Sequence, residues 1–263
     1  MLFDLHNDLI TSGLDASGMR EAAKGYSHAL RGAVLVFWSS KSTGLPPQAD
    51  MPKGKNLYFA VEDLHFFTPD NDDELLRYSP VYCSLTWNYD NALAGGAYGD
   101  GGLTELGRET VEFLNKNKIA VDAAHLNRKS FYEVAERAER FIDSHTFISD
   151  LFKHPRNISF SMIDIIVRGG GLVGLTPVRS FMGNNADLNS YLRGIDVFLQ
   201  RFGDDNLCIG TDYNGSVDFP YELKSYDGFR QVEEYLLKSG YSNKTVDKIF
   251  YKNAVKFFAL GER

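Results

Sequence analysis

The sequence lacks several features that mark particular classes of protein. It contains only two cysteines, and none of its apolar runs approaches the roughly eighteen residues that a membrane-spanning helix needs. Positive charge is also scarce, because 28 Lys and Arg stand against 35 Asp and Glu, for a formal net charge of -7. We therefore expect no membrane association, no disulfide framework and no nucleic-acid partner.

The two cysteines, Cys83 and Cys208, lie inside apolar segments. This position is typical of small buried side chains and argues against a disulfide or a metal thiolate. The first residues also lack the basic stretch and long apolar run of an export signal. The sequence thus predicts a cytoplasmic protein, and it leaves open whether the chain forms a homodimer.

The length and composition are those of a globular protein. The chain has 263 residues, of which 43% are hydrophobic. A chain of this size buries roughly three quarters of its unfolded surface when it folds, so a sizeable core is available without disulfides. Since no internal repeat or linker marks a boundary, we predict a single domain over residues 1–263.

Short apolar runs rich in β-formers alternate with segments of helical periodicity. Eight strands are predicted, at residues 2–5, 32–38, 56–61, 80–86, 119–124, 141–143, 171–176 and 206–210. Helices are predicted at residues 104–118, 129–140, 161–168, 188–202, 226–239 and 243–259. Because alternating strands and helices form parallel βαβ units, this pattern predicts an α/β fold, a single (β/α)8 TIM-type barrel.

Two of the predicted connections are unusual. Residues 39–55 contain three prolines and little helical pattern, so the crossover helix between the second and third strands is expected to be reduced to a loop. Residues 88–102, after the fourth strand, are long and rich in glycine. They are either a substrate-covering loop at the barrel mouth or simply a flexible connection.

Ionisable side chains gather at the carboxyl ends of the predicted strands. Asp4, His6 and Asp8 accompany the first strand, at a spacing of two that would point all three to one face of an extended segment. The third, fifth, sixth and eighth strands end in Glu62, His125, His145 and Asp212. These ends meet at one mouth of a barrel, where several carboxylates need a compensating cation. The pattern predicts a divalent metal site at the C-terminal ends of the strands, suited to zinc or a related ion.

Each of these residues alone has a plainer interpretation. A single histidine in an apolar segment is more often a core residue than a ligand, and an aspartate at a strand end is more often a turn former or helix cap. The metal prediction therefore depends on the whole set. His28 and His65 fall in predicted helix or loop segments and His154 precedes a proline, so these three are left out of the ligand set.

Several sequence blocks, in order along nearly the whole chain, carry a resemblance to a known family. They are Asp4-Leu-His-Asn-Asp-Leu, Val61-Glu, Gly102-Leu-Thr-Glu-Leu-Gly, Val121-Asp-Ala-Ala-His, Ser144-His, His154-Pro-Arg-Asn and Ile209-Gly-Thr-Asp-Tyr-Asn-Gly. Their order resembles that of the motifs of the membrane (renal) dipeptidase family, within the amidohydrolase-like superfamily. This resemblance implies a metal-dependent (β/α)8 barrel that holds two divalent ions, most simply zinc.

The resemblance also implies a set of metal ligands. His6 and Asp8 would bind one ion, and His125 and His145 would bind the other. Glu62 would bridge the two ions. A water between them would lose a proton near neutral pH, and the resulting hydroxide would attack the scissile carbonyl of a dipeptide.

Further residues acquire roles from the same resemblance. Asp212 would orient the water, accept its proton and return it to the departing amine, so Asp212 and Glu62 are the predicted catalytic residues. Arg156 is forked and permanently charged, which suits the C-terminal carboxylate of a dipeptide or a developing oxyanion. Trp87 and Asn88 complete the predicted substrate-binding residues.

Trp87 is also the main departure from the family pattern, because the family usually carries a histidine there. An indole has one N–H group and no second nitrogen, and losing one oxyanion donor typically costs on the order of a hundredfold in rate. Because this departure affects which substrates the site accepts, two alternatives accompany the leading hypothesis of a dipeptidase. One is a binuclear amidohydrolase for another small amide or lactam, and the other is a metal-retaining homologue without catalytic activity.

Overall fold

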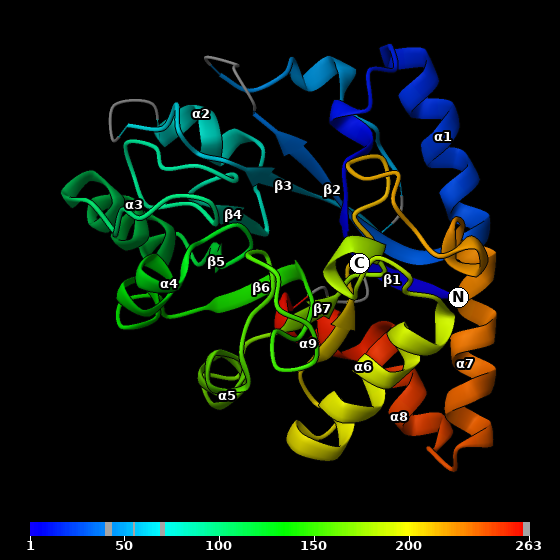
Figure 1. The fold of residues 1–263 in the computed structure, drawn as a ribbon. Helices are drawn as coiled ribbons and strands as arrows, with labels where there is room; N and C mark the ends of the chain where they lie inside the picture. The colour runs from blue at the N-terminus through cyan, green and yellow to red at the C-terminus, as the bar shows by residue number, and fades with distance from the viewer. Residues whose placement is uncertain (40–43, 55, 69–71, 260–263) are drawn as a thin grey trace.

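Eight parallel strands form a closed barrel (Figure 1). The structure is a computed structural model that describes residues 1–39, 44–54, 56–68 and 72–259. The strands are β1 (Leu2–Asn7), β2 (Leu30–Trp38), β3 (Leu57–Glu62), β4 (Tyr82–Ser84), β5 (Ala120–Asp122), β6 (Phe141–Thr146), β7 (Val173–Leu175) and β8 (Leu207–Ile209). Each strand pairs with the next along the chain, and β8 pairs with β1 to close the barrel. The predicted (β/α)8 fold is confirmed.

Helices follow most of the strands on the outside of the barrel. They are α1 (Ala16–Ala29), α2 (Asp72–Arg77), α3 (Glu105–Lys116), α4 (Arg128–Ala135), α5 (Phe160–Arg168), α6 (Leu188–Phe202), α7 (Phe229–Lys238), α8 (Asn243–Asp247) and α9 (Asn253–Phe257). Several begin where a side chain caps the first turn: Thr104, Asn127, Ser159 and Ser242 each accept a hydrogen bond from the backbone three residues ahead. The predicted helix at 243–259 is instead α8 and α9 joined by a π-helical turn, Lys248–Lys252.

The connection between β2 and β3 contains little helix, as predicted. Among its described residues it contains only the 3₁₀ turn Gln48–Asp50, and residues 40–43 and 55 lie outside the described part of the chain.

The two cysteines are free and buried, which agrees with their predicted role in the core. Within the described residues, we find no helix with the length and apolar character of a membrane span.

The inside of the barrel is filled by its own apolar cluster. Its members are Phe3, Leu5, Val34, Val36, Ala60, Tyr82, Ala120, Ile142, Leu172, Cys208 and Ala254. All but Ala254 come from the strands or their amino ends, whereas Ala254 comes from α9. Next to it, Asn253 donates hydrogen bonds to the carbonyls of Asp204 and Leu207, at the start of β8. The C-terminal helical segment therefore closes the barrel at the amino ends of the strands.

Two strands change register near their carboxyl ends. Between Asp4 and Asn7, three residues of β1 pass two of β2. Between Asp143 and Thr146, three residues of β6 likewise pass two of β7. An extra residue of this kind bends a strand and re-aims the side chains that follow.

The irregularity in β1 overturns one prediction from the sequence. The Asp4 carboxylate accepts hydrogen bonds from the Thr211 backbone at 2.9 Å, from the Thr211 hydroxyl at 2.6 Å and from the Tyr226 hydroxyl at 2.6 Å. His6 and Asp8 instead contact each other. The expectation that all three side chains share one face is wrong for Asp4, because equal spacing predicts a common face only along a regular strand.

Candidate active site

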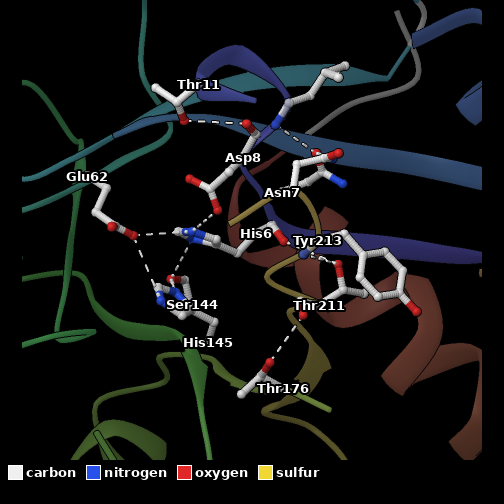
Figure 2. Close-up of polar contacts among 12 residues, drawn as sticks. His6, Asn7, Asp8, Thr11, Glu62, Ser144, His145, Thr176, Thr211 and Tyr213 are labelled. Atoms are coloured by element: carbon white, nitrogen blue, oxygen red, sulfur yellow. Dashed lines mark hydrogen bonds and ion pairs between the residues drawn. The ribbon is translucent and has the colours of Figure 1, made fainter. Parts of the chain in front are cut away.

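The predicted metal ligands meet at the carboxyl ends of the strands, and Figure 2 shows four of them, His6, Asp8, Glu62 and His145. Nε2 of His6 lies 3.2 Å from a Glu62 carboxylate oxygen, and the corresponding distances are 3.4 Å for His125 and 3.8 Å for His145. Asp8 lies 3.3 Å from Nε2 of His6. Each of these five residues is at most 7% exposed. Three imidazoles and two carboxylates thus share one buried site.

Three sets of side chains place their ligand atoms close enough to hold a metal ion. They are His6 with Asp8 and Glu62, Glu62 with His125 and His145, and His6 with His145 and Asp212. The first two sets correspond to the two ion sites that the resemblance implies, with Glu62 common to both. The third adds the predicted proton-transfer residue, Asp212.

The second ring nitrogen of His6 and of His145 contacts a single hydroxyl. Ser144 Oγ lies 3.2 Å from Nδ1 of His6 and 2.8 Å from Nδ1 of His145, and it donates to the Asp122 carboxylate at 2.5 Å. A hydroxyl that donates its proton to a carboxylate can only accept from the two rings, so both rings are protonated on Nδ1. In the neutral form, each ring therefore has its lone pair on Nε2, on the side of Glu62.

These ring nitrogens fit a metal ion. Nε2 of His6 is buried, and no group in the described part of the chain forms a hydrogen bond with it. The Tyr82 hydroxyl supports the same tautomer, because it donates to the Leu5 carbonyl and lies 3.0 Å from Nδ1 of His6. Neutral imidazole nitrogens and carboxylate oxygens are ligands that zinc prefers.

Arg156 and Asn88 both contact His125. Nε of Arg156 donates to Nδ1 of His125 at 3.0 Å, and Nη2 lies 2.8 Å from Nε2 of His145. Oδ1 of Asn88 lies 2.9 Å from Nδ1 of His125. The Arg156 guanidinium is buried and lies 5.3 Å from the centre of the Phe181 ring. Two of the three predicted substrate-binding residues, Arg156 and Asn88, are therefore next to the ligand set.

Burial and charge shift the pKa values at this site strongly. Burial lowers the pKa of His6, but the charges of Asp8 and Glu62 outweigh it and hold that pKa well above its ordinary value. Burial raises the pKa of Glu62, but His125 and His6 hold it well below its ordinary value. The pKa of Asp212 is raised well above its ordinary value by burial and by the charge of Asp8. Shifts of this kind are typical of sites that bind cations or transfer protons.

The residues after β5 and β8 have a strained backbone. His125 has a φ of 72° and Asp212 a φ of 61°, in the left-handed region that side chains other than glycine seldom adopt. Such conformations cost of order 1–3 kcal/mol and persist only where surrounding contacts enforce them. For Asp212, one such contact is the hydrogen bond from its backbone N–H to the carbonyl of His6, at 3.0 Å.

A cavity of about 350 Å³ opens above the ligand set. Its polar lining includes Asp8, Glu62, His125, Arg156 and Asp212, and its walls are formed by Trp38, Trp87, Asn88, Tyr98, His154, Val178, Ser180, Phe181, Gly215 and Ser216. Trp87 thus lies where the substrate prediction put it. Trp38, Tyr98 and Phe181 were not predicted, because nothing in the sequence distinguishes them from other aromatic residues.

The glycine-rich segment 88–102 forms one side of this cavity. Its turns fold around Asp90, whose carboxylate accepts from the backbone of Gly96 at 3.0 Å and of Gly101 at 2.9 Å. Gly99 packs so closely that a Cβ there would overlap the same carboxylate. Tyr98, in the same segment, lines the cavity. Of the two predicted roles, the structure favours a covering loop.

The histidines left out of the ligand set have other surroundings. His154 lies in the cavity wall, where Nδ1 accepts from the Arg156 backbone at 3.2 Å and the ring stacks 4.6 Å from Phe181. His65 lies 3.3 Å from Asp63, outside the candidate ligand sets found among the described residues. The side chain of His28 falls outside the described residues.

Comparison with known sequences points to one family. The sequence model of the membrane dipeptidase family, peptidase family M19, matches residues 58–262. An uncharacterised protein in the pqqA 5′ region of Klebsiella pneumoniae is 27% identical over 182 residues, which cover 64% of this chain and 67% of that protein. Dipeptidase tcpJ of Claviceps purpurea is 23% identical over 159 residues, 59% of this chain but only 37% of the fungal protein.

The same fold occurs in solved structures. A metallopeptidase from Rhodobacter sphaeroides, crystallised with a phosphinate mimic of the dipeptide L-Ala-D-Ala, matches with a TM-score of 0.82 at 18% sequence identity. The match covers 98% of each chain. Since the family's sequence model covers well over half of the 263 residues, this chain belongs to the membrane dipeptidase family.

Proposed function

We propose that this protein is a zinc-dependent dipeptidase that holds two divalent ions and hydrolyses the amide bond of a dipeptide. One observation carries the proposal: Nε2 atoms from β1, β6 and the end of β5 converge on the Glu62 carboxylate, at 3.2–3.8 Å. Ser144 holds two of these rings in the tautomer that a metal ion requires. Membership of a metallopeptidase family supports the same activity.

Divalent ions bound there would polarise the scissile carbonyl and lower the pKa of a water so that a hydroxide forms near neutral pH. The residues of the chain supply the proton transfers. Asp212 is partly buried, has a raised pKa and lies within reach of the His6 and His145 ligand atoms. It is therefore suited to take the proton of the attacking water and to deliver it to the departing amine.

Arg156 would select the length of the substrate. Its guanidinium is buried at the cavity and donates to histidine nitrogens rather than to a carboxylate. A buried guanidinium with neutral partners favours the arrival of an anion, and its fork matches a carboxylate. If it binds the terminal carboxylate, dipeptides are preferred, because a longer peptide has no free carboxylate at that distance from the scissile bond.

Trp87 favours a second candidate, a binuclear amidohydrolase acting on another small amide or lactam. The indole reshapes the cavity at the position where the family usually carries a histidine. A metal-retaining protein without turnover is the third possibility, and Asp212 argues against it, because metal retention requires no proton-transfer carboxylate. The cytoplasmic location stays a prediction, and whether the chain forms a homodimer stays open.

An assay of the zinc-loaded protein on L-L and L-D dipeptides and on a small lactam separates these candidates. We expect hydrolysis of dipeptides. If only the lactam is hydrolysed, the second candidate replaces the first. If the protein holds metal and hydrolyses nothing, the third does.

Ligand variants test where the site is. His125→Ala and Glu62→Gln should abolish hydrolysis and lower the bound metal measured by mass spectrometry, because each removes an atom from a candidate ligand set. His65→Ala is the control, since His65 is a histidine outside those sets, and it should change neither quantity. Equal effects of all three variants would mean that the site is misplaced.

A further inference from the structure

One side of the cavity is built from aromatic rings. Trp38 ends β2 and Trp87 follows β4, and their rings lie 4.9 Å apart. The rings continue outward through Tyr89, 6.4 Å from Trp87, to Tyr98, which lies 6.0 Å from Tyr89 and is 51% exposed. Trp38, Trp87 and Tyr98 line the cavity, and we name these three residues the aromatic wall.

The order of the strands places Trp38 across the mouth from Arg156, whereas Trp87 lies between them, 6.1 Å from the ring of His125. In a closed barrel of eight strands paired in sequence order, β2 lies opposite β6. Trp38 ends β2, and Arg156 lies in the segment that follows β6. Glu62 is on β3, next to Trp38 in the register of the sheet. A dipeptide with its carboxylate on Arg156 and its scissile bond at Glu62 would therefore direct its N-terminal residue toward Trp38, the inner end of the aromatic wall.

The wall also holds a hydrogen-bond donor that has no partner within the described part of the chain. Nε1 of Trp38 is buried, and no acceptor for it is found among the described residues. Buried indole N–H groups normally have an acceptor. A carbonyl oxygen of a bound ligand can supply one, which distinguishes this residue from one that only fills the core.

On the basis of the proposed dipeptidase function, we propose that the preferred substrates carry an aromatic or similarly flat apolar side chain on their N-terminal residue. That side chain packs against the aromatic wall. Aromatic rings attract one another in tilted or offset arrangements at centroid distances of about 4.5–7 Å. Together with burial of the side chain, this contact predicts a preference of about tenfold to a hundredfold over glycine.

Steady-state kinetics test the preference. We expect kcat/KM for Phe-Ala and Trp-Ala to exceed that for Gly-Ala by about tenfold or more, and Ala-Phe to gain less. Trp87→Ala and Trp38→Ala should bring the ratio of Phe-Ala to Gly-Ala close to one, mainly through KM. Trp87→Phe keeps a flat ring and should keep most of the preference, which controls for misfolding.

A matched control is available outside the cavity. Tyr221 is an aromatic residue that is 83% exposed and does not line the cavity. Tyr221→Ala should leave the ratio and both values of kcat/KM unchanged. If Tyr221→Ala reduced the preference as much as Trp87→Ala does, the aromatic wall would not be the site that binds the N-terminal side chain.

Binding to the wall can be measured without turnover. Trp38 and Trp87 are the two tryptophans of the sequence, so the intrinsic tryptophan fluorescence comes from the aromatic wall. We expect a saturable change on titration with L-phenylalanine, the N-terminal product of Phe-Ala, and none with glycine at equal concentration.

The two measurements separate failure of this inference from failure of the proposed function. If no dipeptide is hydrolysed but L-phenylalanine changes the fluorescence, the dipeptidase proposal fails, and the aromatic wall is still a binding site for aromatic side chains. If Gly-Ala and Phe-Ala are hydrolysed with equal kcat/KM and L-phenylalanine does not change the fluorescence, the inference is wrong and the dipeptidase proposal stands.

Discussion

At the scale of single residues, Ser144 links the two halves of the candidate metal centre. Its hydroxyl contacts one ring from each proposed ion site, His6 and His145 (Figure 2). The same hydroxyl donates a hydrogen bond to the Asp122 carboxylate. One hydroxyl thus fixes the tautomer of two proposed ligands. Asp122 is itself buried, and burial raises its pKa, so the short hydrogen bond with Ser144 is one of the contacts that counter this effect.

Replacing Ser144 with alanine should weaken both proposed ion sites at once. Without the shared acceptor, the His145 ring loses this partner and the His6 ring keeps only the Tyr82 hydroxyl, and loss of such a partner typically lowers metal affinity by about tenfold to a hundredfold. Competition with a chromogenic chelator measures the two affinities. Ser161→Ala, at an exposed serine on α5, is the control and should bind metal normally. Unchanged affinities in Ser144→Ala would contradict the role in tautomer selection.

Metal uptake should depend on pH in a direction set by His6. Burial lowers its pKa, but Asp8 and Glu62 raise it to well above the ordinary value, so the metal-free ring holds a second proton near neutral pH. A metal ion binds the neutral ring and must displace that proton, so affinity should rise with pH until the pKa of His6 is passed. Zinc titration calorimetry in two buffers of different ionisation enthalpy measures the protons released. Binding at pH 7 without proton release would contradict this expectation.

The sequence allowed some of these residues to be predicted and not others. His6, Glu62, His125 and Asp212 are polar residues at the ends of apolar runs, a position that the alternation of strands and helices makes conspicuous. Ser144 has no such mark. Its importance comes from a contact with His6 across 138 positions of the chain, which only the closed barrel brings about.

At the scale of elements, the segment after β8 must pass very close to the ligand carboxylates. Gly215 lies in this segment, and a Cβ at this position would overlap carboxylate oxygens of both Asp8 and Asp212. Gly215 ends the block Ile209-Gly-Thr-Asp-Tyr-Asn-Gly of the family resemblance, but no role was predicted for it. The backbone can approach the two carboxylates only because the side chain is a hydrogen atom.

Gly215→Ala should therefore damage the centre without unfolding the barrel. The added methyl group displaces Asp8 or Asp212, so bound metal and hydrolysis should both fall about tenfold or more. Gly25→Ala is the control, because a Cβ at that position of α1 meets no atom within 4 Å. Metal analysis and circular dichroism check the two expectations. Normal metal content in Gly215→Ala would show that the segment after β8 can shift enough to accommodate the methyl group.

Elements differ in how far they could be predicted. The eight strands are buried on both faces and appear as apolar runs, so all were found. Helix α1 was missed because Gly18 and Gly25 weaken its helical pattern, and α2 because it has only six residues. The register changes in β1 and β6 leave no trace in composition, which is why the orientation of Asp4 was predicted wrongly.

At the scale of the whole molecule, stability depends on contacts between the C-terminal segment and the start of β8. Asn253 is 5% exposed, and its amide donates at 2.7 Å to the Asp204 carbonyl and at 2.8 Å to the Leu207 carbonyl. Removing a donor leaves buried carbonyls unpaired. This costs about 1–3 kcal/mol of unfolding free energy.

Asn253→Ala should therefore lower the unfolding free energy by about 1–3 kcal/mol, measured by urea denaturation of the metal-free protein. Bound metal per folded molecule should not change, because Asn253 lies at the end of the barrel away from the ligands. Asn243→Ala, at an exposed position in α8, should alter stability by less than about 0.5 kcal/mol. A destabilisation no larger than that of the control would show that the closure contributes little.

The closure of the barrel by its last helix also constrains when the protein can fold during synthesis. The first strand needs β8 as its neighbour, and the interior apolar cluster needs Ala254. A nascent chain therefore carries an incomplete barrel, with apolar interior side chains and an unpaired β1 edge, until residue 254 has left the ribosome. We therefore expect the incomplete chain to expose strand edges and apolar surface of the kind that chaperones shield.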